Sequence, residues 1–140
     1  TSRGTIISDI FPNLKTDKAI ALRWSPAETM GKKIGLDFLF KSKSVADAQK
    51  YLSQITMTIN NFCVADVSGN IAWFTTGRLP KRKAGVGRIP YLVQDSLDTW
   101  TGWIPYDEMP QQINSKKGWI GNANHNTIPA DYPYYFSLGL

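Results

Sequence analysis

Hydrophobic residues at helical spacing form a one-sided stripe near the middle of the chain. Ser44 precedes the stripe, and serine commonly caps a helix by accepting a hydrogen bond from a main-chain N–H of the first turn. Spacings of three and four residues place the apolar side chains on one face of a helix that we expect to run from Ser44 to about Ile55. The stripe consists of Val45, Ala48, Tyr51, Leu52 and Ile55.

Two short β-branched and apolar runs, residues 4–9 and 19–24, precede this helix and predict strands. The dipeptide Ser25-Pro26 should end the second strand and start a helix, with Ser25 as the N-cap and Pro26 at the first helical position. A second apolar patch should also be helical and should pack against the sheet. It consists of Ile34, Leu36, Phe38, Leu39 and Phe40.

A β-hairpin is predicted in the second half of the chain. Residues 62–66 and 71–76 are strand-like runs, and the turn between them contains Gly69 and Asn70, which are both able to adopt positive φ. Residues 77–110 are rich in Gly, Pro and aromatic residues without a clear period, which predicts a long packed loop. The aromatic residues expected to hold this loop in place are Trp100, Trp103 and Tyr106.

The last strand should begin at Trp119 and Ile120, and the aromatic segment 131–136 should pack back on the body of the protein. No internal repeat or linker-like composition divides the chain. Together these elements predict one piece of structure over residues 1–140, of the α+β class with helices on a mainly antiparallel sheet.

An alternation of asparagines follows the expected last strand and offers the most distinctive chemistry. The run is Asn122-Ala123-Asn124-His125-Asn126. Asparagine is unfavourable in strands because its amide competes with the main chain for hydrogen bonds. One interpretation is a polar turn whose amides satisfy nearby main-chain groups. The other is a site where carboxamides act as directed donors and acceptors, and the residues alone leave both open.

Composition narrows the class of protein. The 140 residues are 42% hydrophobic and 19% charged, and no apolar run approaches the roughly 20 residues of a membrane span. The formal net charge is +5, but zinc-finger spacing, RNP-like strands and basic heptad helices are missing from the sequence. We therefore expect neither a membrane nor a nucleic-acid partner. The opening residues 1–4 carry no initiating Met and no apolar signal segment, so we expect a processed or excised piece.

The sequence offers few residues for metal or nucleophilic chemistry. One His, one Cys and scattered acids provide no metal-ligand spacing. The single cysteine, Cys63, lies in an apolar run and is expected to be a buried structural thiol. Gly85 and Gly87 neither follow a strand nor open a helix, as a phosphate-binding loop would require. A Ser-His-Asp triad would have to use His125, and no serine has the glycine neighbours of a nucleophile elbow.

Two further motifs are FCVADVSGNIAW at residues 62–73 and WTGWIPYDEMP at residues 100–110. The first is similar to the N-F-x-x-A-D-x-x-G-N-I hairpin of the penicillin amidase (penicillin acylase) family, and the second resembles that family's W-T-G-x-I-P-x-D-E-x-P signature. The chain resembles the β-chain of this family along nearly its whole length. These two motifs are specific, and their agreement in order makes chance similarity implausible. Further segments that match in the same order are residues 3–9, 77–80, 118–124 and 131–133.

The resemblance implies an N-terminal-nucleophile hydrolase with a four-layer αββα sandwich that cleaves linear amide bonds. In this family an N-terminal serine is the nucleophile, and a precursor cuts itself into two chains. The oxyanion hole combines a main-chain N–H with the side chain of the second asparagine of an Asn-x-Asn pattern, which transfers this role to Asn124. Asn122 is then expected to hold the turn. The residue before the family's Asn-Phe pair reaches the acyl pocket, which transfers a substrate-binding role to Asn60.

The resemblance also implies what this chain lacks. The catalytic serine stands before the matched part, and Thr1 is not its counterpart because the residues after Thr1 match an internal strand. Residues 134–136 replace the acid that binds calcium in the family, so we expect no calcium and no other cofactor. The chain should be an internal portion of a β-chain that is inactive alone. It should act on a small acyl-amide substrate together with the rest of its precursor, in the periplasm or as a secreted protein.

Two alternatives belong to other functional classes. In the first, the chain is a non-catalytic binding or structural module derived from the same fold. In the second, it is an amidase in its own right, in which Thr1 is the nucleophile and its own amino group is the base. A gene that encodes a serine upstream of this segment would favour the family interpretation over both.

Overall fold

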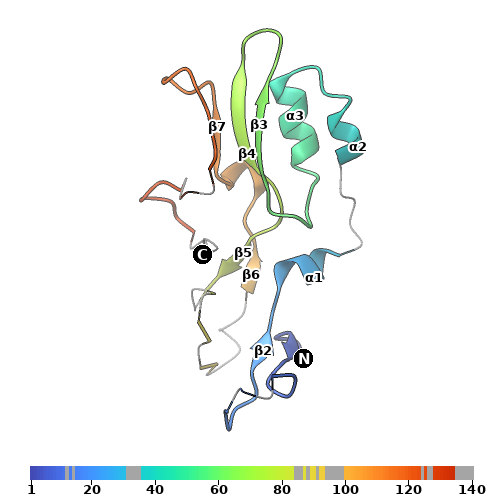
Figure 1. Ribbon diagram of the computed structural model, residues 1–140, viewed down its shortest axis with the longest axis vertical. Helices are drawn as coiled ribbons and strands as arrows, with labels where there is room; N and C mark the ends of the chain where they lie inside the picture. The colour runs from blue at the N-terminus through green and yellow to red at the C-terminus, as the bar shows by residue number, and fades with distance from the viewer. Residues whose placement is uncertain are drawn as a thin grey trace.

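The computed structural model describes residues 1–11, 13, 15–30, 36–83, 87, 89–90, 92–93, 100–123, 125 and 128–134. A three-stranded sheet with two helices lies at one end of the long axis, and a two-stranded ribbon that contains the N-terminus lies at the other (Figure 1). A second two-stranded ribbon lies between them. The strand pairs in the described residues are antiparallel. The prediction of mixed α+β structure with antiparallel sheets is therefore confirmed.

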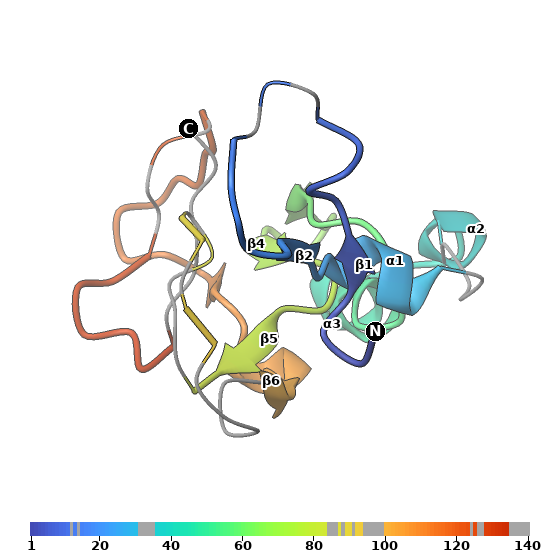
Figure 2. The same cartoon turned by 90° about the horizontal axis from the view of Figure 1, so that it is seen from below.

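The three-stranded sheet has the order β3 (Asn61–Ala65), β4 (Ile71–Thr75) and β7 (Gln111–Ile113). Strands β3 and β4 form the hairpin that the sequence predicts, and their five residues pair without a register shift. In both views residues 128–134, drawn in red-orange, and helix α2 (Leu36–Leu39) lie on opposite sides of this sheet (Figures 1 and 2).

The hairpin turn is organised by one carboxylate. Gly69 has the expected positive φ of 85°, but Asn70 does not adopt the left-handed conformation. Asn70 instead donates its side-chain amide to both carboxylate oxygens of Asp66, at 3.1 and 2.9 Å. Asp66 also accepts from the main-chain N–H groups of Ser68 and Asn70. The aspartate therefore closes the turn without a second left-handed residue.

Helix α3 (Val45–Leu52) packs on one face of the three-stranded sheet. Its N-cap is Ser44, whose side chain accepts a hydrogen bond from the N–H of Asp47 at 3.1 Å, as the sequence predicts. The helix ends before Ile55, but the Ile55 side chain is still buried. Full burial of a large apolar side chain contributes roughly 1.5–3 kcal/mol. The core between helix and sheet consists of Val45, Ala48, Leu52, Ile55, Ala72 and Phe74.

The apolar patch before α3 packs differently from the prediction. Helix α2 contacts α3, where Phe38 stacks on Tyr51 with ring centroids 6.1 Å apart. Leu39 reaches the edge of the core, but Leu36 is exposed and Phe40 is 91% exposed. Because α2 is a single turn, it cannot direct all of its apolar side chains to one side. Ile34 lies outside the described residues.

The N-terminal ribbon consists of β1 (Thr5–Ile6) and β2 (Ala21–Leu22), in the two regions where strands are predicted. Helix α1 (Ser25–Thr29) follows, but its N-cap is Trp24 and no side chain caps it. The prediction of Ser25 as the N-cap is thus wrong by one residue. Since the first N–H groups of a helix have no partner within it, an earlier start before Pro26 costs no hydrogen bond.

The segment predicted as a long loop contains a second ribbon. Strands β5 (Pro80–Arg82) and β6 (Trp100–Trp103) pair with a register shift, and a 3-10 helix, η1 (Tyr106–Glu108), follows. This pairing joins distant parts of the sequence, so local periodicity does not show it. A small core of Leu79, Ile104 and Met109 lies beside the ribbon, with Tyr106 and Tyr134 packed against it. Tyr134 confirms that part of the segment 131–136 packs back.

The last described strand is β7 rather than a strand at Trp119 and Ile120, which are not in regular structure. A turn ends at Gly118, whose φ is 75°, and the Trp119 side chain is 64% exposed. Strand β7 pairs with the edge of β4 through main-chain hydrogen bonds. Its sequence contains two glutamines and little apolar surface, so composition alone does not predict a strand here.

Cys63 is exposed, so the prediction of a buried thiol is wrong. Side chains alternate between the two faces of a strand, and the neighbours Phe62 and Val64 pack towards the core under α3. Cys63 therefore points to the opposite face, where it pairs with Trp73 of β4.

Candidate functional site

Asn60 stands immediately before β3, with an exposed side chain and a firmly held main chain. Its N–H donates to the hydroxyl of Thr76 at 3.2 Å, and the N–H of Thr76 donates to the Asn60 carbonyl at 2.9 Å. Thr76 is fully buried, and its hydroxyl donates to the carbonyl of Thr58 at 2.9 Å. This arrangement fixes where the Asn60 side chain starts while leaving its amide exposed.

Gly77 allows the segment before Asn60 to lie close to the end of the hairpin. The φ of Gly77 is 89°, and a Cβ at this position would lie 2.8 Å from the carbonyl oxygen of Thr58 and from the side chain of Ile59. The N–H of Gly77 donates to the carbonyl of Ile55 at 2.9 Å. A residue with a side chain at position 77 would therefore displace the backbone that carries Asn60.

Asn61, the next residue, differs from Asn60 because its side chain is engaged within the sheet. Its Oδ1 accepts from the indole Nε1 of Trp73 at 2.9 Å and from the hydroxyl of Thr75 at 3.4 Å. Trp73 is buried, so this contact satisfies an indole N–H that would otherwise lack a partner. Sequence reasoning missed this role, since the partners come from the neighbouring strand.

The asparagine run is described only in part. Asn124 and Asn126 lie outside the described residues, so the role assigned to Asn124 stays a prediction. Asn122 is half-buried, and its expected role in holding the turn also stays a prediction. His125 is exposed, and its Nδ1 accepts a long hydrogen bond of 3.4 Å from the N–H of Ala123. The His125 side chain therefore makes a local hydrogen bond to the main chain two residues before it.

Asn114 fixes the chain just before this run. Its Oδ1 accepts from the N–H of Ile71 at 3.0 Å, and its Nδ2 donates to the side-chain oxygen of Asn70 at 3.0 Å. The main-chain N–H of Asn114 donates to the carbonyl of Ile71 at 2.8 Å. Asn114 adopts a φ of 48°, a conformation that asparagine tolerates better than most residues. Residues 114–134 form the segment that contains the asparagine run, which we name the asparagine segment. Its first residue is thereby joined to the first residue of β4.

Two tyrosines fix the chain after the run. The hydroxyl of Tyr132 donates to the main-chain carbonyl of Glu108 at 2.9 Å, and the hydroxyl of Tyr134 donates to the Glu108 carboxylate. Burial, with smaller contributions from the nearby Tyr134 and Glu108 charges, raises the pKa of Tyr132 to about 12. The Tyr132 hydroxyl therefore stays protonated and remains a donor at any physiological pH.

Asp66 also lines the open groove between α3 and the hairpin, which has a volume of about 380 Å³. Hydrogen bonds from Asn70, followed in strength by those from Val45 and Ser68, lower the pKa of Asp66. The carboxylate already accepts from all of these groups, so we assign it a structural role. Among the described residues, neither Asn60 nor Asn122, Ala123 or His125 lines the groove.

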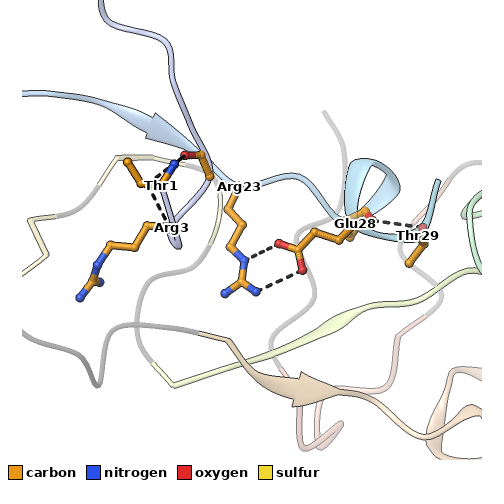
Figure 3. Close-up of polar contacts among 7 residues, drawn as sticks. Thr1, Arg3, Arg23, Glu28 and Thr29 are labelled. Atoms are coloured by element: carbon orange, nitrogen blue, oxygen red, sulfur yellow. Dashed lines mark hydrogen bonds and ion pairs between the residues drawn. The ribbon is translucent and has the colours of Figure 1, made fainter.

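Figure 3 shows the polar contacts of the N-terminal ribbon. Arg23 makes a two-pronged ion pair with Glu28, and its guanidinium carbon lies 4.2 Å from the ring centroid of Trp100 in β6. The contact with Trp100 joins the end of the N-terminal ribbon to the second ribbon, while the ion pair joins it to helix α1. The amino group and the hydroxyl of Thr1 both donate to the carbonyl of Gly4, at 3.0 and 2.9 Å.

The described residues contain no group of three or more His, Cys, Asp or Glu side chains that could hold a metal ion. Within the described ranges, no helix combines the length and apolar character needed to cross a membrane.

Known proteins similar to this chain show the family to which it belongs. The model of the penicillin amidase family matches residues 1–139. The chain belongs to the penicillin amidase family. Acyl-homoserine lactone acylase QuiP of Pseudomonas fluorescens (strain Pf0-1) is 33% identical over 114 residues, which are 77% of this chain and 13% of that protein. Penicillin G acylase of Escherichia coli is 34% identical over 94 residues, 66% of this chain and 11% of that protein.

A third relative of this penicillin amidase family member is made as a precursor. Penicillin acylase 2 proenzyme of Pseudomonas sp. (strain SE83) is 33% identical over 76 residues, which are 54% of this chain and 10% of that protein. The three relatives are acylases by name. The chain spans only 10% to 13% of their length, so the activity of a whole protein is a matter for proposal.

Proposed function

We propose that this chain is an internal portion of the β-chain of an amidohydrolase, in which Asn124 donates a hydrogen bond to the oxyanion. The observation that carries the proposal is the family match over residues 1–139, which includes the Asn-x-Asn pattern at 122–124. The names of the relatives make N-acyl-homoserine lactones and penicillins the first substrates to test.

The chemistry suits a carboxamide. When a nucleophile attacks an amide carbonyl, the π electrons move onto the carbonyl oxygen, which becomes an oxyanion. A neutral N–H donor aimed at that oxygen stabilises the transition state, and its function requires no particular protonation state. Loss of such a donor raises the barrier by roughly 2.7–4 kcal/mol.

Asn60 is our candidate for contact with the acyl group. Its exposed amide starts from a main chain held by the buried Thr76, and Gly77 permits the close packing behind it. Because the main chain at Asn60 is already fixed, binding through this side chain requires no further ordering of the backbone, which favours its use in a substrate pocket.

The remaining parts of the site belong to the proposed full-length protein. The nucleophile is an N-terminal serine outside this chain, and the partner of the chain is the rest of its precursor. The complete fold is then the αββα sandwich of the family, in a periplasmic or secreted enzyme. The precursor form of one relative supports this arrangement.

The test uses the full-length, processed protein and an N-acyl-homoserine lactone or penicillin G as substrate. Asn124→Ala should lower kcat by about 10²–10³ and change KM little, because the hydrogen bond strengthens only as the carbonyl oxygen gains charge. Asn122→Ala is the matched control, and it should lower Tm more than kcat. An Asn124→Ala protein with unchanged kcat would exclude the oxyanion role.

A further inference from the structure

Glu108 receives both tyrosines that follow the asparagine run. The Tyr132 hydroxyl donates to its carbonyl at 2.9 Å and the Tyr134 hydroxyl to its carboxylate. The two tyrosine rings meet edge to face, with centroids 5.7 Å apart and an interplanar angle of 72°. A charged acceptor strengthens a hydrogen bond relative to a neutral one. One glutamate therefore holds two successive aromatic anchors of the C-terminal segment.

Glu108 is itself held by the small core and by the sheet. The N–H of Glu108 donates to the carbonyl of Pro105, and Met109, the next residue, is 3% exposed. The carbonyl of Pro110 then accepts from the N–H of Thr75, the last residue of β4, at 3.2 Å. The acceptor of the two tyrosines is thus connected to β4 through two residues of continuous chain.

Tyr134 is held from more than one direction. Its ring packs against the core of Leu79, Ile104 and Met109, and the ammonium group of Lys81 lies 5.0 Å from the ring centroid. Packing places the ring, while the bond to Glu108 fixes the position of the hydroxyl. Removal of the Glu108 acceptor should therefore loosen Tyr134 without unfolding the region.

The segment between these anchors carries Asn124 in its sequence. Asn114 joins the start of the segment to Ile71, and Glu108 holds the end through Tyr132 and Tyr134. A donor on a loop reaches a reacting atom reproducibly only if the loop is restrained, because an error of about 1 Å can cost about 10²-fold in rate.

We propose that the side chain of Glu108 positions the amide of Asn124 by holding Tyr134 at the end of the asparagine segment. The bond from Tyr132 to the main-chain carbonyl of Glu108 is kept in any substitution at this position. This inference rests on the proposed oxyanion role of Asn124. Glu108 touches no reacting atom in this account; its contribution is the geometry of the loop.

The experiment measures kcat and KM for variants of the full-length, processed enzyme with an N-acyl-homoserine lactone or penicillin G as substrate. Glu108→Ala and Tyr134→Phe should each lower kcat by about 10- to 100-fold, with KM within about twofold of the parent. Glu108→Gln keeps an oxygen acceptor and should restore most of the activity. Asp107→Ala removes the neighbouring exposed carboxylate of η1 and should leave kcat unchanged.

A second set of variants separates positioning from general stability. In an Asn124→Ala background, Tyr134→Phe should lower kcat no further, because the donor that it positions is gone. An undiminished extra loss in that background, or an unchanged kcat in Glu108→Ala and Tyr134→Phe, would overturn the inference while leaving the role of Asn124 intact. If Asn124→Ala alone leaves kcat unchanged, the proposed function fails first, and the inference fails with it.

Discussion

The carboxylate of Asp66 in the hairpin turn accepts a hydrogen bond from the N–H of Val45, the first residue of helix α3, at 3.2 Å. A carboxylate at a helix N-terminus is stabilised by the helix dipole and satisfies an N–H that has no partner within the helix. The turn and the helix therefore share one anionic acceptor, which joins two elements that are distant in sequence.

This shared acceptor makes stability depend on pH. The pKa of Asp66 in the folded protein lies below the ordinary value of 3.8, so its stabilising effect is complete above that value. The effect is lost as the pH falls through the lowered pKa of the folded state. Asp66→Asn should lower Tm near neutral pH, and the difference from the parent should shrink as the pH falls through the lowered pKa. Thermal unfolding of both proteins across this range provides the measurement, with Asp17→Asn at an exposed position as the control.

Gly77 and Gly69 offer a matched pair for backbone crowding. Both have left-handed φ angles, 89° and 85°, but a Cβ would clash only at Gly77. Gly69→Ala should cost about 1–2 kcal/mol of unfolding free energy from the backbone conformation alone. Gly77→Ala should cost more, because Thr58 and Ile59 must also move. Urea unfolding of the two variants measures the difference, and equal losses would contradict the crowding described here.

Asn60 and Asn61 should respond differently to truncation. Asn61→Ala leaves the buried indole N–H of Trp73 without its acceptor and should cost about 1–3 kcal/mol of unfolding free energy. Asn60→Ala should leave stability nearly unchanged. If Asn60 donates one hydrogen bond to the acyl group, worth about 0.5–1.5 kcal/mol, its loss should raise KM roughly two- to tenfold. A KM that is unchanged for every acyl chain tested would remove Asn60 from the pocket.

The isolated 140-residue chain should show no amidase activity. In the proposed mechanism it lacks the nucleophile, and positioning together with covalent catalysis contributes a large factor to the rate. An assay with acyl-anilide substrates at high protein concentration tests this. Measurable turnover that Thr1→Ala abolishes would instead establish Thr1 as a nucleophile.

Local signals in the sequence were sufficient for elements that form from neighbouring residues. The cap at Ser44, the apolar stripe of α3 and the Gly69 turn each depend on a few consecutive positions, and all three are confirmed. The position of Asn60 beside the hairpin could also be predicted, because the hairpin fixes what precedes it.

Elements that depend on a distant partner could not be predicted in the same way. Strand β7 is polar and forms because β4 offers an unpaired edge, while β5 and β6 pair across a long intervening segment. The contacts of Glu108 with the tyrosines likewise join residues far apart in the chain. Their motifs were visible in the sequence, but motifs alone do not reveal which side chains meet.

Strand β4 sets the distance between the two ends of the asparagine segment. Ile71 at one end of the strand binds Asn114, and Thr75 at the other end binds Pro110, beside the residue that holds the tyrosines. An extended strand rises about 3.3 Å per residue and is difficult to compress, so the distance between Ile71 and Thr75 is fixed. Insertions or deletions between Asn114 and Tyr132 would therefore change the length of the loop, while the distance between its attachment points on β4 stays the same.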